Sequence, residues 1–262
     1  MIKKSLRFLY KYSYALFSSA YLFTIGMFSG KHRAFLATIT THFGYRISPR
    51  NIPELTVPEI RPGDVLPSTI ALAIHEPHHV EGNVTFGELA FISSVIAAEK
   101  PKALFEIGTF DGRTALNIAA NAPSDARVHT LDLPPMKEQK TAIPISGDKK
   151  FVPHTQRKLR YTGTAFESRI ATLHGDSATF DYSPFQRNMD FIFVDGAHEY
   201  EYVINDSAKA LAMSKPGGII LWHDYSTWEG ATRALNDLHK TEGVYKNLKH
   251  IRGTSIAYLK VS

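Results

Sequence analysis

Residues 103–222 alternate between short apolar runs and longer stretches in which apolar residues recur every three or four positions. The short runs predict buried strands, and the longer stretches predict helices that each present one apolar face. Strands are expected at 103–106, 127–131, 170–174, 189–194 and 218–222, and helices at about 112–121, 200–213 and 228–240. Strands that alternate with helices are typical of an α/β protein, in which helices cover both faces of a parallel sheet.

The segments on either side of this region also predict regular structure. Thr85-Phe-Gly-Glu88 matches a capping box, so a helix is expected from there to about Ala98, before Lys100-Pro101. Near the C-terminus, residues 244–251 and 254–261 flank Arg252-Gly253 and predict a β-hairpin with a tight turn. Such a hairpin would add an antiparallel strand to the parallel sheet.

The N-terminal region is apolar and uncharged from residue 12 to residue 30, close to the ~20 residues that cross a bilayer. Serine and threonine interrupt this stretch and basic residues stand on both sides of it, so it is a poor spanning segment. It also lacks the small-residue cleavage site of a signal peptide. Two interpretations stay open for residues 1–33. They form helices that pack on the rest of the chain or on a second copy in a homodimer, or they form a basic, aromatic helix that lies on a membrane.

The net charge of +5 is concentrated near the N-terminus. Residues 1–60 contain eight basic and two acidic residues, a net charge of +6, which leaves about −1 for the remainder. A basic appendage favours an anionic or membrane partner for that appendage. The near-neutral remainder argues against nucleic acid as a partner.

Chain length and cysteine content further limit the classes of protein and of site that fit the sequence. The 262 residues, 44% of them hydrophobic, fit one domain of ordinary size plus an appendage. The chain has no cysteine, which excludes disulfides, thiolate metal sites and cysteine nucleophiles.

Residues 46–84 are rich in proline and lack periodicity, so we interpret them as a connecting and capping stretch. The chain is therefore divided into an N-terminal helical, basic extension with its linker, residues 1–83, and a folded domain, residues 84–262. The run His75-Glu-Pro-His-His79 lies in the linker. Because Pro77 would break a helix that aligned the imidazoles, a surface or lid loop is favoured over a metal site.

The connection from residue 134 to residue 166 is longer than the ~12–15 residues beyond which loops tend to be functional or disordered. Its basic residues outnumber its acidic ones: Lys137, Lys140, Lys149, Lys150, Arg157, Lys158 and Arg160 stand against Glu138 and Asp148. It is interpreted either as a solvated insertion or as a cationic lid over an acidic or phosphorylated substrate.

The run from Ala103 to Ala115 predicts a strand, a tight turn with Gly108 and Gly112, and the start of a helix. Glycines let the backbone approach a ligand closely, and free N–H groups at a helix start face it. The spacing is Glu-x-Gly-x-x-x-Gly. It lacks the middle glycine of a dinucleotide fingerprint and the Gly-Lys-Ser/Thr of a phosphate-binding loop.

Glu106-Ile-Gly108-Thr-Phe-Asp-Gly112 resembles the first motif of the class I S-adenosylmethionine-dependent methyltransferases. Further motifs follow in the order of that family: Leu131-Asp132-Leu-Pro, Gly175-Asp176-Ser177, Phe193-Val-Asp195-Gly-Ala-His198 and the segment 215–225. The resemblance covers roughly residues 84–262 and is closest to the bacterial small-molecule O-methyltransferases. It implies a Rossmann-like, doubly wound and mainly parallel sheet of seven strands with a C-terminal antiparallel hairpin.

Ligands of doubly wound sheets collect at the carboxyl ends of the strands, where several acidic residues of this chain stand. The resemblance implies that S-adenosylmethionine binds there, with Asp132 on its ribose and Asp176-Ser177 beside its adenine. Gly108, Gly112 and Glu106 would serve the methionine end. The expected cofactor-binding residues are Glu106, Gly108, Gly112, Asp132, Asp176, Ser177 and Asp195.

A hydroxyl becomes a good nucleophile only when its proton is removed. A divalent cation such as Mg or Mn, or a histidine base, would serve. The metal-dependent relatives implied by the resemblance carry acids at the positions of Asp195 and Asp224, and His223 replaces one acid of their usual pair. We expect Asp195, His198 and His223 to be catalytic and Asp195, His223 and Asp224 to be the candidate metal ligands.

The sequence thus predicts a cytoplasmic enzyme that methylates a hydroxyl of a small molecule, a sugar or an aromatic. One alternative is a methyltransferase for a nitrogen or a lipid-linked acceptor, associated with a membrane through residues 1–33. The other is a nucleotide-binding relative without turnover. Polar residues retained at 195, 198, 223 and 224 argue against the second alternative, since a binding protein does not need them.

Overall fold

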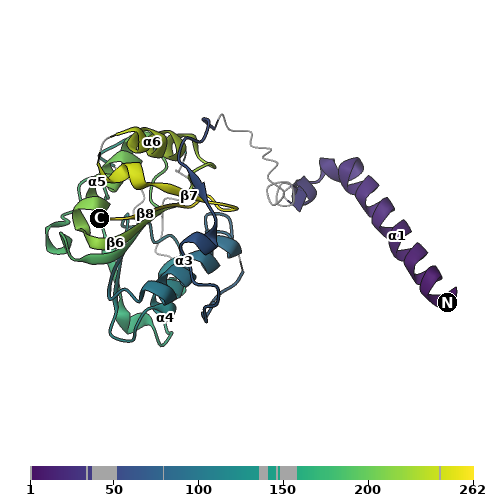
Figure 1. Cartoon of the computed structure of the whole chain (residues 1–262), viewed down its shortest axis with the longest axis horizontal. Coiled ribbons are helices and arrows are strands. Elements are labelled where there is room, and N and C mark those ends of the chain that lie inside the picture. Colours follow the sequence, from purple (N-terminus) through teal and green to yellow (C-terminus); the bar gives the residue numbers. More distant parts are fainter. Residues whose placement is uncertain are drawn as a thin grey trace. The chain divides into compact units, whose positions relative to one another are not determined.

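The computed structural model describes residues 2–33, 35–36, 52–78, 80–135, 141–145, 147, 158–241 and 243–262. The chain divides into two compact units, Met1–Pro49 and Arg50–Ser262. In the first unit, helix α1 spans Ile2–Phe23 and is followed by a short 3-10 helix, Ile25–Phe28 (Figure 1). None of the helices in the described part of the chain combines the length and the hydropathy of a membrane span.

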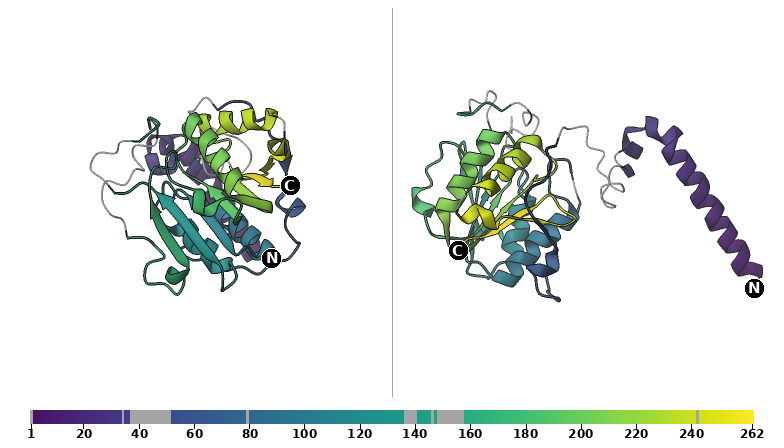
Figure 2. Two further views of the ribbon diagram at one scale, coloured as in Figure 1. Left: turned by 90° about the vertical axis from the view of Figure 1, so that its left-hand side faces the viewer. Right: turned by 45° about the horizontal axis from the view of Figure 1, so that its top comes forward.

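The second unit is built on a sheet of eight strands within the described residues (Figures 1 and 2). The strands are β1 (Glu59–Ile60), β2 (Ala103–Ile107), β3 (Arg127–Asp132), β4 (Ile170–His174), β5 (Met189–Val194), β6 (Ser214–Trp222), β7 (Lys249–Ile251) and β8 (Ala257–Lys260). Their order is β1-β7-β8-β6-β5-β2-β3-β4. Only β8 runs antiparallel to its neighbours, β6 and β7.

Four helices cover the two faces of the sheet (Figure 2). They are α3 (Phe86–Glu99), α4 (Arg113–Asn121), α5 (Tyr200–Met213) and α6 (Glu229–Lys240). One apolar core lies between the sheet and α3 and α4, and a second lies between the sheet and α5 and α6. Successive strand residues serve opposite cores: Leu104 belongs to the first and Phe105 to the second. This explains why the strands are continuous apolar runs, as expected for a sheet buried on both faces.

The expected fold is confirmed, because the doubly wound, mainly parallel sheet has the predicted strands and helices. The chain runs from β2 outward to β3 and β4, then returns to β5 on the other side of β2. This reversal between β2 and β5 is the place where such sheets bind ligands, at the carboxyl ends of the strands.

Three details of the expected fold differ. The described sheet has eight strands instead of seven, because β1 of the proline-rich stretch joins it. The C-terminal hairpin is shorter than predicted, because residues Val244–Asn247 form a 3-10 helix and residues 252–256 connect the strands. The domain boundary lies near residue 50 instead of residue 83. The proline-rich stretch lacks periodicity because side chains from outside it satisfy its backbone: the Val57 N–H donates to the Tyr225 hydroxyl (3.0 Å). In addition, β1 pairs with β7.

Candidate active site

A cavity of about 340 Å³ opens at the carboxyl ends of the central strands. Most of the residues predicted for the site line it: Gly108, Asp132, Asp176, Ser177, Asp195, His198, His223 and Asp224. Glu106 and Gly112 are not among its lining residues. The structure therefore gathers the acids that follow β3, β4, β5 and β6 around one space, as their places at strand ends predict.

The turn after β2 forms one wall of this cavity. Gly108 has φ +99°, and a Cβ atom there would lie 2.0 Å from the carbonyl oxygen of Asp195. The backbones of β2 and β5 approach each other closely at this point, because the Asp195 N–H donates to the Ile107 carbonyl (2.8 Å). Gly112 has φ +79°, and a Cβ there would meet the Tyr161 ring at 2.7 Å. Gly108 thus shapes the cavity, whereas Gly112 packs behind it.

The substitution Gly108→Ala is expected to lower the free energy of unfolding by at least about 3 kcal/mol, because neither backbone can move away from the added methyl. Urea denaturation would measure this loss. Gly87→Ala is the matched control, since a Cβ at Gly87 meets nothing within 4 Å. A Gly108→Ala variant as stable as the Gly87→Ala variant would contradict the close approach.

Asp132 ends β3 with its carboxylate held by two backbone groups. Its Oδ2 accepts from the Phe110 N–H (2.8 Å) and its Oδ1 from the Leu133 N–H (2.7 Å). A carboxylate oxygen accepts more than one hydrogen bond. The side chain is therefore oriented by the backbone and positioned to accept hydroxyl groups of a ligand in the cavity.

Asp176 and Ser177 follow β4 and connect several elements. The Asp176 carboxylate accepts from the Ala142 N–H (2.7 Å) and the Tyr202 hydroxyl (2.9 Å). The Ser177 hydroxyl donates to Asp206 (3.1 Å). Ala142 belongs to the long connection 134–166, so this connection reaches the cavity rim.

Much of the expected cationic lid lies outside the described residues, including Lys137, Lys140, Lys149, Lys150 and Arg157. Lys158 and Arg160 are described, and Arg160 forms an ion pair with Asp111 (2.7 Å).

His79 of the His75–His79 run also lies outside the described residues. In that run, the backbone N–H of His75 donates to the Asn117 side chain (2.8 Å), and the imidazole ring of His75 lies edge-on to the Phe166 ring.

Asp206 lies below Ser177, and burial raises its pKa to about 7, although hydrogen bonds from Ser177 and Asn205 oppose that shift. An unfolded aspartate titrates near pH 4, so between about pH 4 and 7 the folded chain binds a proton that the unfolded chain lacks. Stability therefore falls as the pH rises through this window and levels off above it.

The substitution Asp206→Asn should remove this fall. Between pH 5 and pH 8 the free energy of unfolding of the variant is expected to rise, relative to that of the parent chain, by on the order of 2–3 kcal/mol. Urea midpoints of both proteins at the two pH values would measure the difference. A constant difference between the two proteins would show that Asp206 is ionised throughout.

Glu106 was expected to serve the cofactor, and the structure places it behind the Gly108 turn. Its side chain is fully buried, and its Oε2 accepts from the Thr130 hydroxyl (2.5 Å). Burial raises its pKa well above the ordinary value, and the nearby charges of Asp195 and Asp132 add to that shift. Among the described residues its buried Oε1 has no hydrogen-bond partner. Glu106 therefore supports the turn from below, outside the cavity lining.

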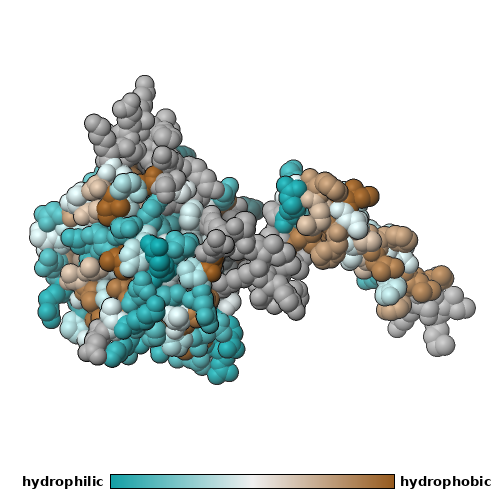
Figure 3. Space-filling model, turned by 90° about the horizontal axis from the view of Figure 1, so that it is seen from above, coloured by the Kyte–Doolittle hydropathy of each residue, from teal (hydrophilic) through white to brown (hydrophobic). Residues whose placement is uncertain are grey.

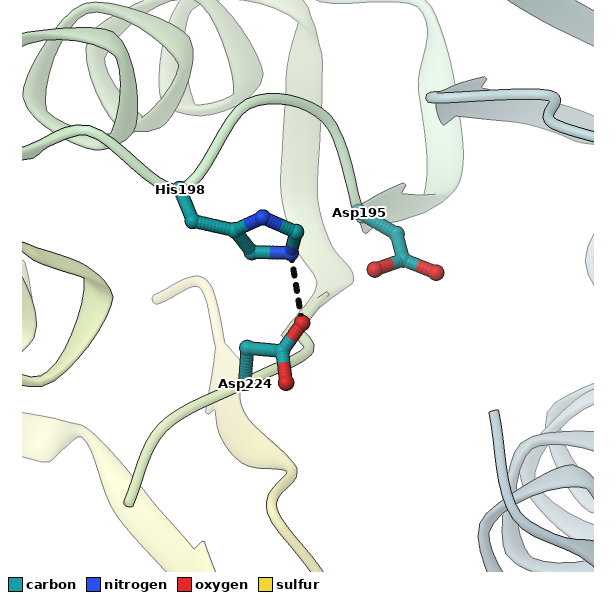
Figure 4. Close-up of side chains that lie close together, drawn as sticks. All are labelled: Asp195, His198 and Asp224. Atoms are coloured by element: carbon teal, nitrogen blue, oxygen red, sulfur yellow. Dashed lines mark ion pairs between the residues drawn. The ribbon is translucent and has the colours of Figure 1, made fainter. Parts of the chain in front are cut away.

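Asp195, His198 and Asp224, which also line the cavity, form a cluster (Figure 4). Each offers one ligand atom, and these atoms lie within 4.8 Å of one another. The His198 Nε2 lies 2.6 Å from the Asp224 Oδ2. The His198 ring also stacks on Trp228, with centroids 4.3 Å apart and planes inclined by 8°. This stacking fixes the imidazole plane and directs Nε2 toward the acids.

His223 has a different environment from the one predicted. Its Nδ1 lies 2.9 Å from the Asp195 Oδ1 and 3.1 Å from the Asp224 Oδ2, and its Nε2 lies 3.2 Å from the Glu88 Oε2. Burial lowers its pKa, but these three carboxylates outweigh burial and raise the pKa well above the ordinary value. Both ring nitrogens thus face carboxylates. The geometry favours His198 over His223 as metal ligand or base, and His223 as the positive charge that holds the acids together.

Sequence reasoning missed Glu88 as a partner of the site. The sequence predicts a capping box at Thr85-Phe-Gly-Glu88, and this capping box is present at the start of α3. The same carboxylate also faces His223 and accepts from the Ser255 N–H (2.7 Å). A capping acid is usually exposed, so the burial of Glu88 is the sign of its second role as a partner of His223. That burial cannot be seen in the sequence.

Residues 81–83 also line the cavity and were not predicted. They belong to a strap that the buried guanidinium of Arg113 holds. Arg113 donates to the carbonyls of Glu76 (2.7 Å), Val84 (2.8 Å) and Pro77 (3.2 Å). An arginine at the start of an otherwise uncharged helix is the sequence feature that could have indicated such an anchor.

Comparison with known proteins concerns the domain that carries this cavity. The family model described as "Methyltransferase domain" matches residues 105–225, which contain part of β2, all of β3 to β6 and most of the cavity residues. Residues 105–225 are therefore similar to a methyltransferase domain. The expectation of a methyltransferase is thereby confirmed, while the comparison with curated proteins finds no match.

Solved structures share the fold of this methyltransferase domain. The methyltransferase PaMTH1 of Podospora anserina, solved with S-adenosylhomocysteine, aligns with a TM-score of 0.53 and 16% identity. The alignment covers 70% of this chain and 81% of that one. A Klebsiella pneumoniae structure titled as an O-methyltransferase aligns with a TM-score of 0.50 and 14% identity, over 70% of this chain and 84% of that one.

Proposed function

We propose that the protein transfers a methyl group from S-adenosylmethionine to a hydroxyl of a small molecule. The observation that carries this proposal is the layout of the cavity. Asp132 and Asp176, hydrogen-bond acceptors for a nucleoside, stand at the ends of β3 and β4, and the cluster of Asp195, His198 and Asp224 follows β5 and β6 on the other side of β2. The methyl donor and its acceptor would thus occupy one space, as direct transfer requires.

The residues of the cavity fit S-adenosylmethionine. Asp132 is oriented by the Phe110 and Leu133 N–H groups and would accept the two ribose hydroxyls. The glycine at 108 leaves the backbone exposed to the methionine end, and Ser177 with Asp176 lies on the lining where the adenine would sit. The volume of about 340 Å³ falls in the range of small-molecule pockets. The S-adenosylhomocysteine bound by the Podospora relative supports the same ligand class.

The acceptor hydroxyl must lose its proton as its oxygen attacks the methyl carbon. The new O–C bond forms while the C–S bond breaks, and its electron pair stays on sulfur to give S-adenosylhomocysteine. The His198 Nε2 faces the Asp224 carboxylate at 2.6 Å and donates to it, so the other ring nitrogen, Nδ1, would take the proton. Asp224 would stabilise the imidazolium that results. Trp228 keeps the ring in plane.

The donor set also fits a divalent cation. Two carboxylates and one imidazole suit Mn²⁺ or a similar transition ion better than Mg²⁺, which prefers oxygen alone. Asp195, His198 and Asp224 would hold it, and such an ion would lower the pKa of a bound hydroxyl. His223 would then keep the two acids in place through its Nδ1.

Two further proposals concern partners. Residues 1–33 contact a partner outside the methyltransferase domain. That partner is a membrane surface, and the alternative is a second copy of the chain in a homodimer. If that surface is a membrane, a lipid-linked acceptor becomes a second candidate substrate. The exposed aromatic side chains of α1 are the observation that favours it.

The test is a radiolabelled methyl-transfer assay with S-adenosylmethionine and a panel of sugars, phenols and catechols. We expect transfer to at least one hydroxylated acceptor and loss of transfer in His198→Gln. Transfer restricted to amines would contradict the proposed chemistry. Thorough chelation followed by addition of Mn²⁺ or Mg²⁺ separates the two mechanisms: activity that survives chelation excludes the ion and leaves His198 as base.

A further inference from the structure

Large apolar and aromatic side chains are exposed mainly on the N-terminal unit. In the described part of the chain, all but three of the exposed ones lie within residues 6–35, the exceptions being Leu72, Val80 and Phe86. Helix α1 carries most of them, and brown and tan surface extends along the described part of the N-terminal unit in Figure 3. Exposed apolar surface of this extent marks a site that contacts a partner.

The charged residues of α1 share one narrow strip. Arg7, Lys11 and Ser18 are spaced by four and seven residues, which places them on one face of a helix. Leu9, Leu16 and Phe23, spaced by seven, lie on the opposite face, and they are 57%, 57% and 63% exposed. The helix is therefore amphipathic, with an apolar arc much wider than the two-position seam of a coiled coil.

Tyrosines lie beside the basic residues, on the same side of α1. Tyr10, Tyr14 and Tyr21 are spaced by four and seven residues, line one shallow groove along α1, and flank the basic strip. Their rings are 72%, 67% and 47% exposed. A tyrosine with an apolar ring and a wet hydroxyl suits the boundary between the acyl and headgroup regions of a membrane.

The charge of the segment identifies the kind of membrane. Residues 1–53 contain no acidic residue, whereas Lys3, Lys4, Arg7, Lys11, Lys31 and Arg33 are basic. A second copy of the same helix would bring these like charges together, but anionic phospholipid would complement them. The helix is also not apolar enough to span a bilayer.

We propose that α1 is an interfacial helix that binds the methyltransferase to the surface of anionic phospholipid membranes. It lies in the plane of the interface, with the face of Leu9, Leu16 and Phe23 toward the acyl chains. Arg7 and Lys11 reach up to the phosphates along their apolar stems. This inference does not depend on which acceptor is methylated.

Co-sedimentation of the full chain with vesicles tests the charge requirement. We expect binding to vesicles of phosphatidylcholine with one-third phosphatidylglycerol and much weaker binding to phosphatidylcholine alone. Neutralising the strip with Arg7→Gln and Lys11→Gln should weaken binding about thirtyfold. The matched control, Lys102→Gln with Lys260→Gln, removes two exposed lysines of the other unit and should leave binding unchanged.

Tryptophan scanning tests the orientation. Leu16→Trp should be quenched by lipids brominated in their acyl chains, and Ser18→Trp, on the basic strip, should be quenched far less. Binding that ignores the strip, equal quenching at the two positions, or a vesicle-independent dimer that Arg7→Gln and Lys11→Gln disrupt would each overturn the proposal. Titration of S-adenosylhomocysteine should be unaltered in all of these variants, which distinguishes a failure of α1 from a failure of the active site.

Discussion

Replacing Asp224 by asparagine is expected to lower kcat by about a thousandfold, with little change in the affinity for S-adenosylhomocysteine. Asp224 faces the His198 Nε2 at 2.6 Å and the His223 Nδ1 at 3.1 Å. Burial raises its pKa, but the nearby charges of His223 and His198 prevail and hold the pKa well below the ordinary value, so the residue acts as a fixed negative charge. An amide in its place cannot stabilise a protonated His198 or hold a cation.

Asparagine is the right substitute because of the backbone. Asp224 has φ +62°, a conformation that asparagine adopts as readily as aspartate but that strains alanine. Single-turnover kinetics with saturating donor would measure the loss. Asp190→Asn is the matched control, because this acid pairs with Lys215 outside the cavity and its loss should change kcat less than twofold. Equal rates in the two variants would remove Asp224 from the reaction.

Replacing Asp132 by alanine is expected to weaken the binding of S-adenosylmethionine by about a hundredfold or more. Two hydrogen bonds from ribose hydroxyls to a charged acceptor are lost, each worth roughly 1.5–3 kcal/mol. The Phe110 and Leu133 N–H groups also lose their acceptor, so the turn that forms the cavity wall loosens. The effect should fall on KM for the donor, with kcat largely recovered at saturation.

Fluorescence or calorimetric titration would measure this loss. Asp125→Ala is a suitable control, since this exposed acid pairs with Lys102 away from the cavity. An Asp132→Ala variant that binds the donor as tightly as the control would show that the ribose does not lie at Asp132.

The parts of the site that sequence predicts are those that backbone topology determines. Strands that end in an acid bring that acid to one edge of a parallel sheet, so Asp132, Asp176, Asp195 and Asp224 were all placed around one cavity. The helices and strands follow from apolar periodicity because both faces of the sheet are buried.

Other features depend on side-chain direction, which sequence spacing does not determine. His198 and His223 were equivalent candidates by position, and only the structure shows that both nitrogens of His223 face carboxylates. Glu88 is far from the motifs in sequence, and its role follows from the packing of α3 against the sheet. The strap that contains residues 81–83 has no pattern of its own, because Arg113 holds it from outside through the carbonyls of Glu76 and Val84.

Calorimetric titration of the full chain with S-adenosylhomocysteine tests the central claim most directly. The arrangement of Gly108, Asp132 and Asp176 around one cavity predicts one-to-one binding with a Kd in the micromolar range, retained in Asp224→Asn and lost in Asp132→Ala. Absence of binding at millimolar concentration, or binding that is indifferent to Asp132, would contradict the assignment of this cavity to the methyl donor.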